Sequence, residues 1–183
     1  MGLDQFLHAS KYASGTKWST EESNALYRSI MELAKIDDFV SDELPSASIE
    51  VKVAYWRKAN AVHGWFVTNC QDGEDNCQTS YVSRDQLTEL VDICKKVLAD
   101  NSLASELLPV QEGFFFGGTE YDEWYMGNVQ YTADAIGKLL TLPTDWEFNY
   151  SSSWWFSKKF TRWVALLLLS VYTYTYTYYE RTE

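Results

Sequence analysis

The segment Ala-Tyr-Trp-Arg-Lys-Ala-Asn-Ala-Val-His-Gly-Trp-Phe, residues 54–66, concentrates aromatic, basic and amide side chains. Read as a helix, it places Trp56, Asn60 and His63 on one stripe, with Arg57 one step to the side. An indole offers a stacking surface, a guanidinium pairs with phosphate or carboxylate, and an imidazole titrates near neutral pH. The stripe therefore predicts a site for a small anionic or nucleotide-like molecule. The alternative is a half-buried helix with Trp56 and His63 in the core and the cations in water.

A second candidate segment, Gly-Gly-Thr-Glu-Tyr-Asp at 117–122, places two glycines before an expected helix. Free N–H groups at a helix start bind anions, and glycines let a ligand approach the backbone. The two carboxylates would repel an anion unless they turn away or face Arg57 and Lys58, forming a polar pocket or a salt-bridge network. The alternative is a turn whose glycines only serve backbone geometry. The candidate ligand-binding residues of both segments are Trp56, Arg57, Lys58, Asn60, His63, Gly117, Gly118, Thr119, Glu120 and Asp122.

Composition narrows the class of protein. The 183 residues fit one domain with a core of its own, and an aromatic content of 16% argues against disorder. The net charge of −11 argues against direct binding of nucleic acid, because neutralising phosphates requires a basic surface. It permits a basic partner protein, although solubility alone also explains an acidic surface.

The cysteines indicate a reduced compartment. Cys70, Cys77 and Cys94 are odd in number and lack C-x-x-C spacing, and the N-terminus lacks the parts of a secretion signal. Cys70, Cys77 and His63 could approach a zinc ion, but there is no second close pair, so we expect neither metal nor cofactor. The acidic loop at 72–76 lacks the ligand pattern of an EF-hand and is expected to be solvated.

The periodicities predict a single α+β domain with a small, mostly antiparallel sheet partly covered by three to five helices. Helices are expected from capping boxes that begin at Ser19, Ser83 and Thr119 and to run over 19–36, 83–100 and 119–142. On the first, Leu26, Ile30 and Leu33 are expected to share one face. Strands are expected at 3–7, 48–54, 113–116 and 146–152.

The C-terminal tail at 158–183 differs from the domain expected at 1–157. An apolar run at 163–171 is too short to span a membrane, and the Tyr-Thr alternation at 172–178 is typical of a strand. Such a strand pairs with the domain, pairs with a neighbour or forms a sticky appendage. Self-association is therefore possible, and no membrane span is expected.

Several motifs together resemble one protein family. They include Met-Gly-Leu-Asp at 1–4, Tyr-Trp-Arg-Lys-Ala-Asn-Ala-Val-His at 55–63, Asn-Cys-Gln-Asp-Gly-Glu-Asp at 69–75, Gly-Phe-Phe-Phe-Gly-Gly-Thr-Glu-Tyr-Asp at 113–122 and Trp-Glu-Phe-Asn-Tyr-Ser-Ser-Ser-Trp at 146–154. Over about residues 1–154 the chain resembles small bacteriophage- and prophage-encoded proteins, some of which are labelled phosphoglycerate kinase. The resemblance implies a phage accessory protein made in the host bacterial cytoplasm. Kinase chemistry does not follow, because the chain lacks a G-x-x-x-x-G-K-[ST] loop.

Three functions remain open. The first is a non-enzymatic binder that sequesters a small anionic or nucleotide-like ligand and so counters host defence. The second is an acidic inhibitor of a host defence protein such as a nuclease, suggested by the charge and the surplus of Tyr and Trp. The third is a small nucleotide-acting enzyme with His63 as acid or base, oriented by Glu120 or Asp122. No nucleophile is evident, so we assign no catalytic residue.

Overall fold

The computed structural model describes residues 2–40, 43, 45–113 and 116–154, which form a single α+β domain. One antiparallel sheet has the strand order β2-β1-β4-β3. Its strands are β1 (Leu3–Ser14), β2 (Ser46–Arg57), β3 (Thr79–Val82) and β4 (Glu147–Trp154). The helices are α1 (Glu21–Ala34), α2 (Asn60–Cys70), α3 (Arg84–Ala99), α4 (Ala104–Leu107) and α5 (Glu123–Leu139). The tail at 158–183 and the boundary expected at 157 lie outside the described residues.

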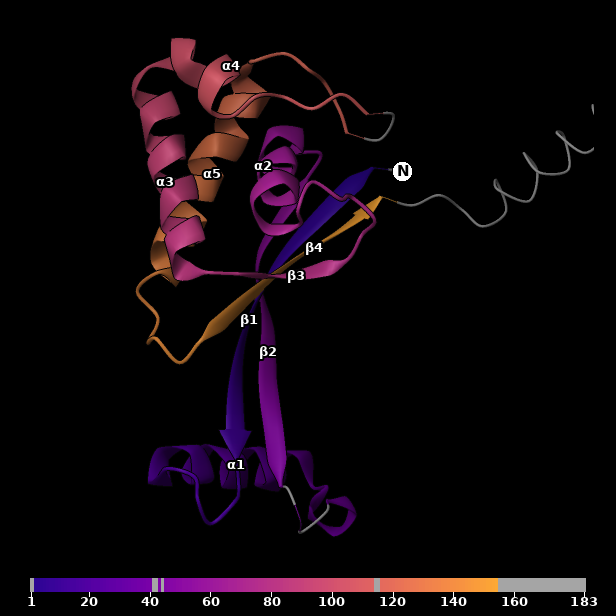
Figure 1. Cartoon of the computed structure of the whole chain (residues 1–183), viewed down its shortest axis with the longest axis vertical. Helices are drawn as coiled ribbons and strands as arrows, with labels where there is room; N and C mark the ends of the chain where they lie inside the picture. Colours follow the sequence, from indigo (N-terminus) through magenta and orange to yellow (C-terminus); the bar gives the residue numbers. More distant parts are fainter. Residues whose placement is uncertain (1, 41–42, 44, 114–115, 155–183) are drawn as a thin grey trace, which may run out of the picture.

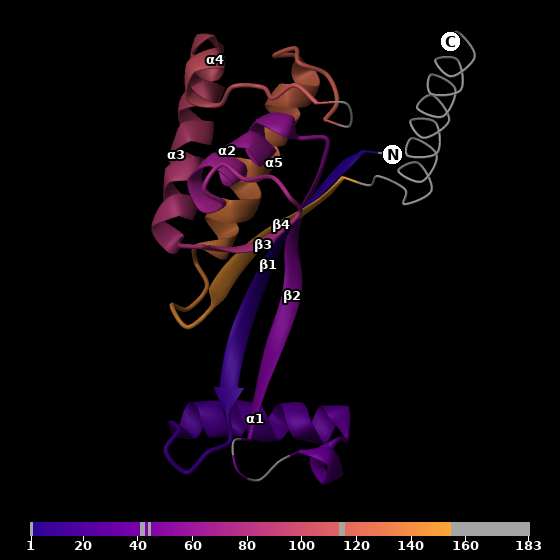
Figure 2. The ribbon, with the colours of Figure 1, turned by 45° about the vertical axis from the view of Figure 1, so that its right-hand side comes forward.

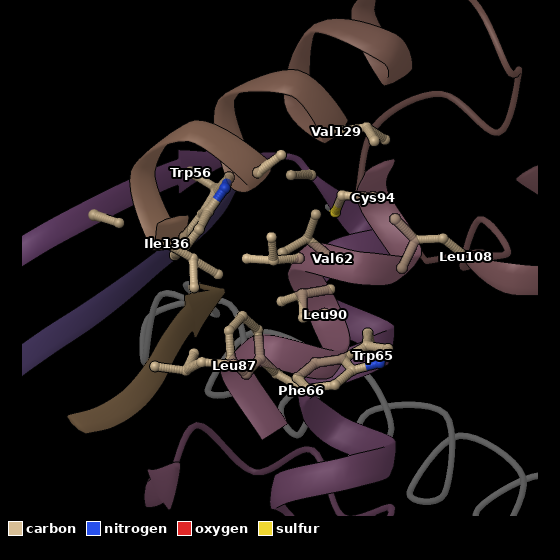
Figure 3. Close-up of a cluster of buried hydrophobic side chains, with 14 of the residues drawn as sticks. Trp56, Val62, Trp65, Phe66, Leu87, Leu90, Cys94, Leu108, Val129 and Ile136 are labelled. Atoms are coloured by element: carbon tan, nitrogen blue, oxygen red, sulfur yellow. The ribbon is translucent and has the colours of Figure 1, made fainter. Parts of the chain in front are cut away.

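The core lies between the sheet and the helices α2, α3 and α5, which pack together in Figure 1 and Figure 2. Between residues 3 and 10 of β1, fully buried and half-buried side chains alternate, as the period of a strand requires. Leu7 and Ala9 on the buried face join the main hydrophobic cluster, much of which Figure 3 shows. Phe66, Leu90 and Ile136 contribute to this cluster from the three helices, and each is fully buried.

Strands β1 and β2 extend beyond the rest of the sheet. β4 pairs with β1 only as far as Ser10, whereas the pairing with β2 continues to the end of β1. Helix α1 lies across the far end of this ribbon in both Figure 1 and Figure 2. We call the described residues of 11–50 the arm and the other described residues the body. Lys11 Nζ connects the two, because it pairs with Asp145 of the body at 2.6 Å and with Glu22 of α1 at 3.4 Å.

A β-bulge in β2 lies where the arm meets the body. Leu7 pairs with Ala54, but the next residue of β1, His8, pairs with Lys52, so Val53 is an extra residue. The extra residue shifts the alternation of β2 by one position. Trp56 therefore shares the buried face of the sheet with Ala54.

The helix expected from residue 54 is wrong in its first part. β2 continues to Arg57, and α2 begins only at Asn60. Trp56 consequently lies on a strand, whereas Asn60 and His63 lie on a helix, so the predicted stripe does not form. The bulge explains the error, because it ends the simple alternation at the point where the aromatic and basic residues begin.

The expected helices exist, with corrected starts. The capping box at the start of α3 is confirmed, with Ser83 and Gln86 as its two members. α1 is instead capped by Thr20, and α5 is capped by Asp122, whose carboxylate accepts from the N–H of Tyr125. In both helices, the residue that caps the helix is the one whose side chain reaches a free N–H group in the first turn. In α1 the expected apolar face is only partly used, since Leu33 is 84% exposed.

The strand expected at 113–116 is not found at Gly113 or Phe116, the two residues of this segment that the structure describes. The N–H of Phe116 donates to the carbonyl of Gly113 at 3.0 Å, a bond within the segment itself, and residues 114–115 lie outside the described part. The short strand β3 was not expected from the sequence. In the described part of the chain, no helix has the length and apolar character needed to cross a membrane.

Candidate functional site

A hollow of about 260 Å³ lies where α2 and α5 begin. The two predicted segments meet here: Lys58 and Asn60 come from the first, and Gly118, Glu120 and Asp122 come from the second. The other lining residues are Ala59, Ala61, Val62, Val110, Trp124, Tyr125, Asn128 and Val129. Lys58 and Glu120 are exposed to solvent, so the hollow is open on one side.

The start of α2 presents unused backbone donors to the hollow. No side chain caps this helix, and the first N–H to bond along it is that of His63, which donates to the carbonyl of Ala59 at 3.0 Å. The preceding N–H groups, those of Asn60, Ala61 and Val62, have no acceptor among the described residues. A helix start with free N–H groups carries partial positive charge and favours an anionic group.

The side chain of Asn60 connects the segments that border the hollow. Its Nδ2 donates to the carbonyls of Phe116 (3.2 Å) and Gly118 (2.8 Å), and its Oδ1 accepts from the N–H of Gln111 at 3.1 Å. The side chain is 4% exposed. The side chain of Asn60 therefore ties the segment before α5 onto the start of α2 and has no donor of its own left for a ligand.

The two glycines of the second segment have different surroundings. Gly117 has φ +95°, and a Cβ built on it would lie 3.2 Å from Cβ of Lys58 and 3.4 Å from its carbonyl oxygen. A glycine is needed here because both the conformation and the close approach disfavour a side chain. Gly118 faces open space and lines the hollow. Thr119 is exposed and is not among the lining residues.

The α5 side of the hollow is acidic and aromatic. Asp122 is partly occupied, since its Oδ1 accepts from the N–H of Tyr125 at 2.9 Å, while Glu120 projects into solvent. Trp124 is 66% exposed and offers a flat surface at the rim. The phenol of Tyr125 donates to the carbonyl of Leu108 at 2.8 Å, and burial raises the pKa of this phenol above its usual value. With Lys58, the lining combines one cation and two carboxylates.

Three residues of the first predicted segment do not line the hollow, and neither do Gly117 and Thr119 of the second. Trp56 is 2% exposed, and its Nε1 donates to Oγ1 of Thr132 on α5 at 2.9 Å, within the core shown in Figure 3. Arg57 is exposed at the end of β2, opposite Asp4 on β1. His63 is 1% exposed. None of the three lines the hollow, so they do not converge with Lys58 on one open surface.

His63 instead belongs to a buried hydrogen-bond network that sequence reasoning missed. Its Nδ1 lies 2.8 Å from the hydroxyl of Tyr150, and its Nε2 lies 3.0 Å from Oδ2 of Asp75. The Tyr150 hydroxyl donates to Oε1 of Gln5 at 3.2 Å, and Nε2 of Gln5 donates to the carbonyl of Ala59 at 3.2 Å. Burial raises the pKa of Tyr150 well above its usual range. Both imidazole nitrogens are therefore occupied inside the core, away from any substrate in the hollow.

The acidic loop is only partly solvated. Asp75 accepts from Nε1 of Trp154 at 3.0 Å in addition to its contact with His63, so the loop is tied to α2 and β4. A signal for this network was present in the alternation of the strands. Gln5 and Tyr150 occupy inward positions of β1 and β4, and a polar side chain at an inward position requires a buried partner.

Two of the three cysteines, Cys70 and Cys94, are poor nucleophiles because they are shielded from water. Burial raises the pKa of the Cys70 and Cys94 thiols to about 12, which keeps both protonated and weakly nucleophilic. Across the described residues, no group of three or more His, Cys, Asp or Glu side chains is placed to hold a metal ion.

Comparisons with protein-family models, with curated proteins and with solved structures found no match to this chain.

Proposed function

We propose that this protein is a non-enzymatic binder of a small, anionic, nucleotide-like ligand, which it holds in the hollow between α2 and α5. The observation that supports this function is the uncapped start of α2. Three of its N–H groups have no acceptor among the described residues, and they belong to residues that line the same hollow as Lys58. Backbone donors and a lysine together are a common arrangement for a phosphate or carboxylate.

The opposite wall suggests the rest of the ligand. Glu120 and Asn128 offer acceptors for an amino or hydroxyl group, and Trp124 offers a surface for a planar ring. A volume of about 260 Å³ is just below the usual range of roughly 300–1,000 Å³ for enclosed ligand sites. A compact ligand of mononucleotide size, with its ring partly exposed, fits these limits.

The same lining argues for sequestration rather than turnover. Its described residues include no Ser, Thr, Cys or His, and His63 is held in the core by Asp75 and Tyr150. We propose that the protein acts as a phage accessory protein in the bacterial cytoplasm and withholds its ligand from host defence. The phage origin in this proposal comes from the motif resemblance at 1–154.

The test is calorimetry with a panel of mononucleotides and inorganic phosphate. Lys58→Ala removes the cation and should weaken binding by about tenfold or more, because a charge-assisted contact is lost. Lys95→Ala, an equal change of charge on the exposed face of α3, is the matched control and should bind like the wild type. Trp124→Ala should weaken nucleotides but leave inorganic phosphate unchanged.

Two results would contradict the proposed function as a ligand binder. One is the absence of binding across the panel; the other is equal weakening by Lys58→Ala and Lys95→Ala. Mass spectrometry of the recovered ligand separates a binder, which returns it intact, from an enzyme, which alters it. Circular dichroism establishes that each variant is folded.

A second function, an acidic inhibitor of a host defence protein, is favoured by a different observation. Trp18, Leu33 and Phe39 of the arm are each more than 80% exposed, and the chain carries a net charge of −11. Exposed aromatic and aliphatic side chains on an acidic protein suit a basic partner. A complex isolated from host lysate that dissociates with added salt and is lost in Trp18→Ala would support this function. Failure to recover any protein would count against it.

A further inference from the structure

The outer edge of β2 is open along the arm. β2 ends the sheet on one side, and no described strand pairs with its outer edge. Near the body the edge is covered, because the N–H of Tyr55 donates to the hydroxyl of Tyr131 on α5 at 3.3 Å. Further along, Glu50 and Lys52 are exposed, and Val51 is 46% exposed. An open strand edge of this kind is a template for another strand.

The sequence of this edge complements itself. In Ile-Glu-Val-Lys-Val at 49–53, an acid and a base flank the central Val51. If two copies pair antiparallel around Val51, Glu50 of each copy lies directly opposite Lys52 of the other. A register centred on Glu50 would place two glutamates opposite each other, and a register centred on Lys52 would oppose two lysines. Directly opposite residues interact most strongly, and like charges there are destabilising.

The orientation of the side chains allows these pairs. Glu50 and Lys52 pair with Ser10 and His8 of β1, so both project from the sheet face opposite the core. Within the described residues Glu50 makes no ion pair, and Nζ of Lys52 lies over the Phe6 ring at 4.5 Å from its centre. Each charge therefore remains available to an opposite charge on the same face.

We propose that a second copy of this chain docks on this edge, joining two sheets into one across a two-fold axis at Val51. This interaction is independent of the ligand proposed for the hollow. The bulge at Val53 and the cover over Tyr55 limit the ladder to a few residues on each side of the axis. The dimer is therefore weak, and its population rises with protein concentration.

Charge reversal tests the register. Sedimentation velocity of the full chain over a concentration series should show a monomer–dimer equilibrium that weakens with salt. Glu50→Lys creates two like-charge oppositions across the axis, and so does Lys52→Glu. Each should raise the dimer dissociation constant by about tenfold, since both symmetric pairs are lost. The double variant Glu50→Lys with Lys52→Glu restores both pairs and should return to within about threefold of the wild type.

Matched controls separate this register from a general effect of charge. Glu89→Lys and Lys95→Glu make the same changes on exposed positions of α3, away from β2, and should leave the dissociation constant unchanged. A protein that stays monomeric at every concentration overturns the proposal. A dimer whose dissociation constant is unchanged by the single charge reversals also overturns it. So does a double variant that dissociates as readily as the single variants.

Discussion

Strands β1 and β2 run through both the body and the arm, but the two regions bury very different amounts of apolar surface. In the body, α3 alone contributes five buried side chains, and Phe66 of α2 stacks on Tyr150 with ring centres 4.0 Å apart. In the arm, the only buried residue of α1 is Met31, while Leu33 is 84% exposed. The difference shows that an amphipathic pattern predicts a helix without predicting how well that helix is covered.

The width of the supporting surface explains the contrast. The body helices pack on four strands and on each other, whereas α1, among the described residues, lies on the two-stranded ribbon of β1 and β2. A ribbon two strands wide cannot cover the whole apolar face of a helix. We therefore expect most of the folding free energy to come from the body.

The largest effect that tests this contrast is a matched pair of truncations. Phe66→Ala removes a fully buried ring and should lower the free energy of unfolding by about 3–5 kcal/mol. Leu33→Ala, at an exposed position of the arm, should change it by less than about 0.5 kcal/mol. Urea denaturation followed by circular dichroism measures both. Similar losses in the two variants would show that the arm is packed as tightly as the body.

A smaller effect distinguishes buried from exposed polar groups. Tyr150→Phe leaves Nδ1 of His63 and Oε1 of Gln5 without their shared hydroxyl, at a cost of about 1–3 kcal/mol. Tyr12→Phe, the control in the arm, removes a hydroxyl from a residue that is 62% exposed and should cost less than about 0.5 kcal/mol. Equal unfolding curves for the two variants would contradict a structural role for the network.

The smallest effect over a single step of the measurement, one pH unit, is a dependence on alkaline pH that originates in the body. Burial raises the pKa of Cys94 from its usual 9.0 to about 12. The unfolded thiol therefore loses its proton first, and the stability due to neutral Cys94 is present below pH 9 and declines as pH rises toward 12. The decline is roughly 1.4 kcal/mol per pH unit within that window.

Denaturant titrations at several alkaline pH values measure this slope. Cys94→Ala should reduce it by the contribution of one thiol. Leu33→Ala alters the arm without removing a titrating group and should keep the slope of the wild type. If Cys94→Ala leaves the slope unchanged, the buried thiol is not its source.

Local signals in the sequence predicted much of the fold. The capping box at Ser83 marked α3 correctly, because both of its hydrogen bonds form within four residues. The alternation at 48–54 identified β2 but ended at the bulge, since an extra residue reverses which side chains face inward. β3 has only four residues, too few for a periodic pattern, and depends on its pairing with β4.

The candidate site was predictable only in part. The sequence identified the segments around Lys58 and Glu120, which border one hollow, and left their meeting open as one of two possibilities. The partners of His63 could not be inferred from spacing, because Asp75 and Tyr150 lie 12 and 87 residues away. Trp56 was misplaced for the same physical reason as the helix, namely the change of phase in β2.

If Lys58 contacts the ligand proposed for the hollow, stability and ligand capture oppose each other at this position. Its φ of 58° is a left-handed conformation that glycine adopts at little cost and that other residues adopt at a cost of roughly 1–3 kcal/mol. A glycine here would relax the connection between β2 and α2, yet it would delete the charged side chain of a residue that lines the hollow. Selection for thermal robustness alone would therefore tend to erase the lysine, and its retention would indicate selection for capture.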